Sequence, residues 1–314
     1  MKPDLFRADL AAKPEALARL AASLRSADPF AELPRDVRRV VFLGMGSSRY
    51  AARVAAYRLR ARGLDAAAEY ASAPAYPPVP GTLYVAVSAT GGSRETLDAL
   101  EPLRGKAPLV ALTNVPDSPV GEAADLVVPM LAGPEEGGVA CRTFQHTSAL
   151  LLALEQRLTG PGRDLPALLD RTAEASAELL EGRWLDRVLP LLDGPDGVYM
   201  IAPFERISSA DQSALMVREG PRRPADACET GDWAHVDVYL TKTRDYRALL
   251  FPGSPYDAQA MEWITRRGST VVTVGGEVDG AAAAIRYRGD EDPDLALLTE
   301  TLVAELVAAA WWND

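Results

Sequence analysis

A chain of 314 residues is long enough for two domain-sized units, and its composition, 48% hydrophobic and 25% charged, is that of a folded globular protein. Its 44 acidic and 33 basic residues give a net charge of −11, which repels phosphate backbones and anionic lipids and so disfavours nucleic-acid and membrane partners. An anionic ligand would need local donors, such as the backbone N–H groups at helix N-termini.

The cysteines and histidines favour neither disulfide nor metal chemistry. Cys141 and Cys228 lie in different halves without a CxxC partner, and His146 and His235 lack the spacing of a metal site. The first residues show no export signal, and no stretch of 18 uncharged apolar residues occurs. We therefore expect a reduced, cytoplasmic protein with no membrane span, no metal and no cofactor.

The first 34 residues predict a helical lead-in, because apolar residues recur at helical spacing and Pro14 suits the start of a second helix. From residue 39 the pattern changes to short apolar runs that alternate with helical segments. Buried strands are expected at 40–43, 83–87, 109–113 and 126–129. This alternation predicts a parallel, doubly wound sheet.

The same order recurs about 160 residues later, with strands expected at 197–201, 248–251 and 270–274, so we infer an internal duplication. Helices at 143–158 and 297–312 close the two units, and one at 165–180 connects them. The predicted fold is α/β, with two tandem flavodoxin-like units. We expect a lead-in at 1–34, a first unit at 35–160, a connecting helix at 161–184 and a second unit at 185–314.

Two Gly/Ser loops, Gly44–Ser48 and Ser88–Ser93, follow predicted strands of the first unit. In doubly wound sheets ligands bind beyond the carboxyl ends of strands at a switch point, so both loops can face one cleft. Each loop runs into a helix N-terminus, and their hydroxyl groups belong to Ser48, Ser88, Thr90 and Ser93. This combination suits a phosphate ester. The alternative is that a sharp strand-to-helix turn merely requires small residues.

A dinucleotide site is disfavoured. The segment Gly44–Arg49 lacks the third glycine of G-x-G-x-x-G, the next strand ends in no clear ribose-binding acid, and a P-loop is absent.

The motifs resemble, in order and spacing, those of the double sugar isomerase (SIS) domain proteins. The likeness covers about residues 35 to 310 and rests on G-x-G-S-S, V-S-A-T-G-G-S-R-E-T, Asn114–Pro116 with Ser118, and Ala132–Ala140. It is greatest to the isomerase part of glutamine–fructose-6-phosphate amidotransferase and to relatives that act on phosphorylated amino sugars and fructosamines.

The resemblance implies that the two loops hold a sugar phosphate. The residues at the phosphate-binding positions are Ser48, Ser88, Ala89, Thr90 and Ser93, and those at the sugar-binding positions are Gly46 and Val139. In the second repeat the corresponding loop is Pro252–Pro255, whose prolines remove N–H donors. We therefore expect one phosphate site per chain.

The resemblance also implies that Glu219 is the base that moves a proton between C1 and C2 of the sugar, with its pKa raised by partial burial. His235, sixteen residues later, would assist ring opening and could reach the site of a partner subunit in a homodimer. Without the resemblance, Glu219 would be interpreted as a solvated residue at a helix end and His235 as a hydrogen-bonded structural histidine.

Three departures from the amidotransferase pattern shape the functional hypothesis. Met216 stands where a lysine precedes the catalytic glutamate, the sequence shows no tail with the lysine that closes over the sugar, and it shows no glutaminase. We therefore expect neither an imine with the enzyme nor glutamine-dependent synthesis. The leading hypothesis is isomerisation, deamination or deglycation of a phosphorylated ketose or amino sugar. A non-catalytic sugar-phosphate sensor is the alternative, and a nucleotide-dependent oxidoreductase is a weaker third.

Overall fold

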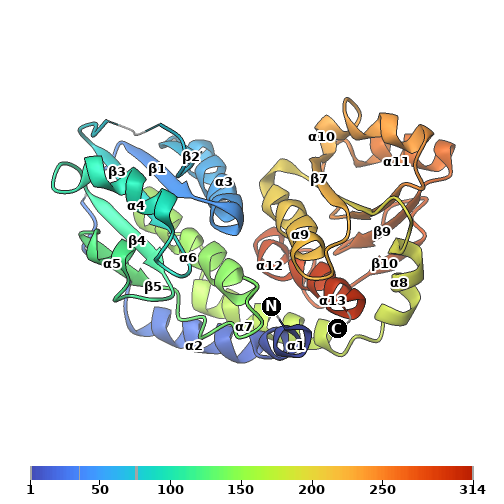
Figure 1. Cartoon of the computed structure of the whole chain (residues 1–314), viewed down its shortest axis with the longest axis horizontal. Coiled ribbons are helices and arrows are strands. Elements are labelled where there is room, and N and C mark those ends of the chain that lie inside the picture. Colours follow the sequence, from blue (N-terminus) through green and yellow to red (C-terminus); the bar gives the residue numbers. More distant parts are fainter. Residues whose placement is uncertain (1, 35, 75–76, 313–314) are drawn as a thin grey trace. The chain divides into compact units, whose positions relative to one another are not determined.

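The computed structural model describes residues 2–34, 36–74 and 77–312 and contains two five-stranded parallel sheets (Figure 1). The chain forms two compact units, one around each sheet. The sheet A unit consists of Glu15–Pro134 and Arg142–Asp170, and the sheet B unit of Met1–Pro14, Glu135–Cys141 and Arg171–Asp314. The prediction of two doubly wound α/β units is confirmed.

Sheet A has the strand order β2-β1-β3-β4-β5. The strands are β1 (Arg39–Gly44), β2 (Asp65–Tyr70), β3 (Thr82–Val87), β4 (Leu109–Thr113) and β5 (Leu126–Pro129). The three central strands are almost entirely buried, which is why each is a continuous apolar run. The chain turns to opposite sides of β1 to form β2 and β3, so the switch point lies between β1 and β3.

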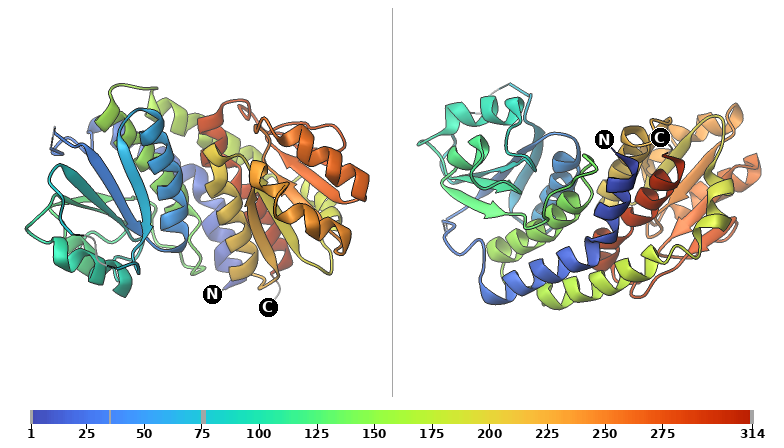
Figure 2. Two further views of the ribbon diagram at one scale, coloured as in Figure 1. Left: turned by 90° about the horizontal axis from the view of Figure 1, so that it is seen from above. Right: turned by 60° about the horizontal axis from the view of Figure 1, so that its bottom comes forward.

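Helices cover both faces of sheet A (Figure 2). The helices are α2 (Lys13–Ser26), α3 (Gly46–Ala61), α4 (Arg94–Leu100), η1 (Glu101–Leu103), α5 (Pro119–Glu122) and α6 (Arg142–Thr159). Helix α3 packs on α6, and α4 packs on α5. Helix α7 (Leu165–Leu180) runs from this unit into the next.

Sheet B has the order β10-β9-β8-β6-β7. Its strands are β6 (Val198–Ala202), β7 (Ala225–Glu229), β8 (Arg247–Leu250), β9 (Thr270–Val274) and β10 (Ala283–Ile285). The helices around it are α1 (Pro3–Ala11), α8 (Leu185–Leu192), η2 (Phe204–Arg206), α9 (Ile207–Glu219), α10 (Thr230–Trp233), η3 (Asp237–Lys242), α11 (Asp257–Arg267), α12 (Pro293–Thr299) and α13 (Thr301–Trp311). With β6 in the place of β1, the strand order repeats that of sheet A, as expected of a duplication.

The structure contains three strands that the sequence pattern did not predict: β2, β7 and β10. All three lie at sheet edges and lack continuous runs of branched apolar residues. An edge strand pairs with only one neighbouring strand and is less buried, so its sequence signal is weak. The helix predicted at 297–312 is two helices, and the first is capped by Asp292, whose Oδ1 accepts hydrogen bonds from Asp294 N–H (3.1 Å) and Leu295 N–H (3.4 Å).

Candidate functional site

The first glycine turn joins β1 to α3 at the switch point of sheet A. A Cβ atom on Gly44 would lie 3.0 Å from the Ser48 Cβ and 3.3 Å from the Val87 carbonyl oxygen, so a larger residue would push its neighbours apart. Gly46 has a positive φ of 48°. The N-cap residue Met45 offers no side-chain hydrogen bond, which leaves the first turn of α3 without a side-chain cap. An anion can therefore take that place.

The second loop follows β3 and is braced by the loop after β4. Asn114 N–H donates to the Ala89 carbonyl (3.0 Å), and Val120 N–H donates to the Gly91 carbonyl (3.0 Å). Gly91 has a φ of 65°, and a Cβ there would lie 1.8 Å from the Ser118 hydroxyl oxygen. The loop is thus held rigidly at the carboxyl edge of the sheet. Within it Ser88 is buried, Ala89 is half-buried and Thr90 is exposed.

Ser93 already serves the helix that follows. Its hydroxyl accepts from Thr96 N–H at 3.5 Å as the N-cap of α4 and donates to the Glu95 carboxylate at 3.0 Å. The pKa of the Glu95 carboxyl is lowered by a hydrogen bond from the backbone N–H of Glu95 and by the one from the Ser93 hydroxyl. Ser88 and Thr90 are therefore the hydroxyls of this loop that are better placed to meet a ligand.

Asn114 joins two segments at the carboxyl edge of sheet A. Its Nδ2 donates to the Gly133 carbonyl (2.8 Å), and its Oδ1 accepts from Ala132 N–H (3.0 Å). The end of β4 is thereby tied to the segment that leaves β5.

The segment after this point, Glu135–Cys141, is a strap that belongs to the sheet B unit although the sequence on both sides of it belongs to the sheet A unit. Gly137 N–H donates to Asp9 Oδ2 (2.7 Å), and Gln212 Nε2 on α9 donates to the Ala140 carbonyl (2.8 Å). Val139 is 1% exposed within this strap. The structure therefore places Val139 in the unit that carries Glu219 and not in the unit of the two Gly/Ser loops.

Glu219 is the last residue of α9 and is half-buried. Burial raises the pKa of its carboxyl, and the negative charge of Glu135 raises this pKa further. Both effects make the carboxylate a stronger base than a solvated glutamate. Glu135 lies within the motif Ala132–Ala140, but its position in the sequence predicts no role, because only the fold brings the strap to α9.

Met216, one turn before Glu219, is buried and receives a weak hydrogen bond from Gln212 Nε2 at its sulfur (3.6 Å). It is a core residue of α9, as is expected where an apolar side chain replaces a lysine.

His235 is exposed and follows α10, the short helix that begins directly after the carboxyl end of β7. Figure 1 shows α10 at this end of β7. Glu219 precedes the amino end of the same strand. A five-residue strand spans roughly 13 to 17 Å, so the two residues lie at opposite edges of sheet B. Within one sheet B unit the structure does not bring Glu219 and His235 together.

Two tryptophans pack against the chain directly after Glu219. A Cβ on Gly220 would lie 2.8 Å from the Trp312 ring, and the Arg223 guanidinium lies 4.5 Å from the centre of the Trp311 ring. Both rings therefore pack against the chain that follows α9.

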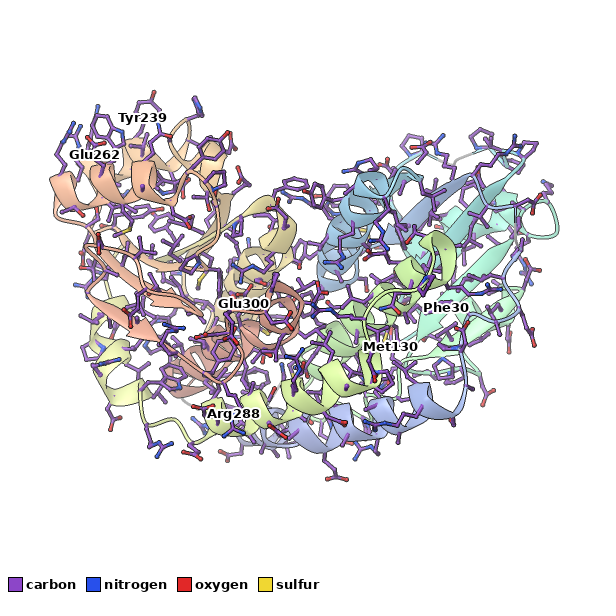
Figure 3. The ribbon with its side chains drawn as sticks, turned by 180° about the vertical axis from the view of Figure 1, so that it is seen from behind. Phe30, Met130, Tyr239, Glu262, Arg288 and Glu300 are labelled. Carbon is purple, nitrogen blue, oxygen red and sulfur yellow. The ribbon has the colours of Figure 1, made fainter. Side chains whose placement is uncertain are left out.

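The loop of the second repeat is occupied by the protein's own carboxylate. Asp257 Oδ2 accepts hydrogen bonds from Gly253 N–H (2.6 Å) and Ser254 N–H (3.0 Å). Arg206 binds the Pro252 carbonyl and the buried carboxylate of Glu300, which lies inside the sheet B unit (Figure 3). The backbone donors of this loop are therefore already bonded to Asp257.

No group of three or more His, Cys, Asp or Glu side chains suited to a metal ion occurs in the described part of the chain. Among residues 2–34, 36–74 and 77–312, no helix has the length and apolar character needed to cross a membrane.

Residues 35–155 match the SIS domain family. The chain is 27% identical over 301 residues to the glutamine–fructose-6-phosphate aminotransferase (isomerizing) of Zymomonas mobilis. The aligned region covers 90% of this chain and 48% of the relative. It is 33% identical over 287 residues to the enzyme of the same name from Bradyrhizobium diazoefficiens, covering 84% of this chain and 46% of the relative. The chain spans less than half the length of these relatives.

Solved structures share the fold over nearly the whole chain. The C-terminal domain of glucosamine-fructose-6-phosphate aminotransferase from Francisella tularensis has a TM-score of 0.82 at 18% identity and covers 99% of this chain and 97% of its own. Glucosamine-6-phosphate deaminase from Thermotoga maritima has a TM-score of 0.77 at 19% identity, with 98% and 93% covered. Tagatose-6-phosphate ketose/aldose isomerase from Escherichia coli has a TM-score of 0.76 at 16% identity, with the same coverage.

Proposed function

Because the chain belongs to the SIS-domain family, we propose that it binds a phosphorylated ketose or amino sugar and catalyses isomerisation, deamination or deglycation with Glu219 as the base. The names of one relative and two structural neighbours support this class of substrate, since each name contains a sugar 6-phosphate. The observation that carries the proposal is the half-buried carboxylate of Glu219, whose pKa is raised by burial and by Glu135.

The phosphate is assigned to the sheet A unit. The uncapped first turn of α3 and the braced loop after β3 offer backbone N–H groups, a helix dipole and the hydroxyls of Ser88 and Thr90. These are the local donors that an acidic chain needs to hold an anion.

The proton transfer is assigned to Glu219. In the open-chain sugar its carboxylate removes a proton from one of the two carbons C1 and C2, an enediol or enolamine forms, and the resulting carboxylic acid returns the proton to the other carbon. A pKa raised toward neutrality makes both halves of this cycle accessible. His235 would help to open the ring from a partner subunit in a homodimer, because the chain's own His235 lies at the other edge of sheet B.

The alternative function is a sugar-phosphate sensor without catalysis. It is favoured by the buried, apolar Met216 at the position of a lysine in the amidotransferase pattern. Such a protein would still bind the sugar phosphate through the two Gly/Ser loops but would not catalyse proton transfer.

Proton exchange separates the two functions. The sugar phosphate that binds best is incubated in deuterated water, and loss of the C1 or C2 proton signal is followed by NMR. We expect exchange with the wild type, none with Glu219→Gln, and normal exchange with Glu262→Gln, a control at an exposed position of α11 (Figure 3). Tight binding without exchange in the wild type would establish the sensor, and unchanged exchange in Glu219→Gln would remove Glu219 as the base.

Thermal stabilisation tests the phosphate site. Fructose 6-phosphate or glucosamine 6-phosphate should raise the melting temperature, whereas unphosphorylated sugars should not. The double change Ser88→Ala, Thr90→Ala should abolish the shift, since hydrogen bonds to a charged group contribute about 1.5 to 3 kcal/mol each. Ser254→Ala, in the occupied loop of the second repeat, is the matched control. Equal stabilisation by unphosphorylated sugars would contradict the assignment.

Mixing two inactive variants tests whether His235 contributes to the site of a partner subunit. If His235 completes a neighbour's site, chains with Glu219→Gln and chains with His235→Ala should regain activity when combined in verified heterodimers. A protein that is monomeric at assay concentration would rule out the sharing of His235.

A further inference from the structure

His235 lies on a short exposed segment, Ala234–Val236, whose two neighbours in the chain are buried. Trp233 before the segment and Asp237 after it are both buried, whereas His235 between them is exposed. The backbone N–H of His235 donates to the Asp232 carbonyl (2.8 Å), so the segment leaves α10 in a closed turn. The buried side chains at its two ends therefore decide where the exposed imidazole is held.

One tyrosine hydroxyl joins the two ends of this segment. Trp233 Nε1 donates to the Tyr246 hydroxyl at 2.8 Å, and the same hydroxyl donates to Asp237 Oδ2 at 3.0 Å. A hydroxyl has a single proton to donate, so it can accept from the indole while it gives that proton to the carboxylate. We call Trp233, Tyr246 and Asp237 the Tyr246 clamp, because one oxygen atom ties the residue before the segment to the residue after it.

The ring of Tyr246 is itself held in place by sheet B. It is buried and stacks on the ring of Tyr199, a residue of β6, with the ring centres 4.2 Å apart and 13° between the planes. The Trp233 ring meets it edge-on, with the centres 6.2 Å apart. Strand β6 is an interior strand, paired with β7 and β8. The clamp is thus anchored to the sheet.

The hydrogen bond between Tyr246 and Asp237 favours the ionised carboxylate. Burial raises the pKa of the Asp237 carboxyl, and this hydrogen bond opposes the rise. A buried carboxylate that loses such a donor is destabilised. A polar network whose members are satisfied specifies one arrangement of the groups that it joins. Removing the hydroxyl should therefore release the Asp237 end of the segment.

We propose that the Tyr246 clamp positions His235 for opening of the sugar ring. This inference rests on the proposed function, in which His235 helps to open the ring. In that step a proton leaves the C2 hydroxyl, the bond between C2 and O5 breaks, O5 takes up a proton and C2 becomes a ketone. An imidazole can give or take such a proton only from a fixed position at hydrogen-bond distance. The later transfer between C1 and C2 belongs to Glu219 and does not need the clamp.

Two sugars separate ring opening from this later transfer. Fructose 6-phosphate is mostly cyclic, whereas 5-deoxyfructose 6-phosphate has no O5 and cannot form the same ring. Exchange of their C1 protons in deuterated water is followed by NMR. With fructose 6-phosphate, His235→Ala and Tyr246→Phe should both exchange about 10-fold more slowly than the wild type. With the 5-deoxy sugar, both variants should exchange at the wild-type rate, which a general loss of structure would not allow.

Two further variants separate positioning from folding. Asp237→Asn keeps an oxygen that can accept from the Tyr246 hydroxyl and should retain most of the rate with fructose 6-phosphate. Tyr287→Phe is the matched control, because Tyr287 is also a buried tyrosine of the sheet B unit, but its hydroxyl has no hydrogen-bond partner among the described residues. This control should behave as wild type with both sugars. Melting temperatures of all variants confirm that they are folded.

Amide hydrogen exchange tests the clamp without a sugar. In Tyr246→Phe the peptide that contains His235 should exchange faster than in the wild type, because the turn closed by the His235 N–H is released. Peptides of the sheet A unit should be unchanged. Equal protection of the His235 peptide in both proteins would overturn the inference.

The failures of the inference and of the proposed function are distinguishable. If Tyr246→Phe slows exchange of both sugars equally, or leaves fructose 6-phosphate unaffected while His235→Ala slows it, the clamp has no positioning role and the proposed function stands. If His235→Ala has no effect on fructose 6-phosphate, the role of His235 fails together with the inference. If the wild type exchanges neither sugar, the proposed proton transfer fails as well.

Discussion

The ion pair between Lys13 and Glu305 gives the sharpest prediction on stability. Lys13 Nζ lies 2.5 Å from Glu305 Oε2, and both side chains are fully buried in the sheet B unit. The pair joins the start of α2 to α13, and burial raises the pKa of Glu305 while Lys13 opposes that rise. Lys13→Met would leave a buried carboxylate without its counter-charge.

Breaking a buried pair by removing one partner costs about 3 to 5 kcal/mol, because the remaining charge has lost water and gained nothing in return. For a unit of this size, about 1 kcal/mol corresponds to roughly 2 to 4 °C in melting temperature. We therefore expect Lys13→Met to lower the melting temperature of the sheet B unit by about 6 to 20 °C.

The free energy of unfolding of Lys13→Met should decrease as the pH rises. Without Lys13 the pKa of Glu305 rises further above its value in the unfolded chain, so the folded state binds a proton that the unfolded state releases. The stability of the variant should therefore fall as pH rises from the usual carboxyl range, and the difference from wild type should be smaller at pH 5 than at pH 8. Scanning calorimetry at both pH values measures this.

The double variant Lys13→Met, Glu305→Met removes both charges and should be at least as stable as Lys13→Met alone, since an apolar pair of similar volume carries no desolvation cost. A double variant less stable than the single one, or a single variant within 1 °C of wild type, would refute the electrostatic reasoning.

Three further outcomes are expected. Gly91→Ala should destabilise the protein by about 1 to 3 kcal/mol in urea unfolding and abolish phosphate binding, because the new Cβ would clash with the loop after β4 and the φ of Gly91 is positive. Gly92→Ala is the control and should behave as wild type, because nothing lies within 4 Å of its Cβ. Glu135→Gln should shift the acid limb of the proton-exchange rate to lower pH, because the negative charge that raises the pKa of Glu219 is gone; an unmoved limb would show that the two carboxylates are not coupled. Burial raises the pKa of Glu300 to about 7, so between about pH 4.5 and 7 only the folded state holds the proton, and the stability should decline as the pH rises through this range. Glu300→Gln should flatten this decline, which melting temperatures measured across the pH range would show.

The sequence by itself determined the fold class and the location of the two Gly/Ser loops. The central strands are continuous apolar runs because both of their faces are covered, and the glycine turns are visible because close strand-to-helix approaches require them. The repeat of this pattern after about 160 residues made the duplication readable without any tertiary information.

Only the tertiary structure decided which side chains meet. The strap Glu135–Cys141 joins the sheet B unit through contacts with Asp9 and Gln212, far away in the chain, and so brings Glu135 to Glu219. Lys13 finds Glu305 at the other end of the sequence, and Asp257 fills a loop that resembles a ligand site. Periodicity and spacing report burial and local backbone conformation, whereas partnerships between charged groups depend on contacts across long sequence separations, and these exist only once the chain has folded.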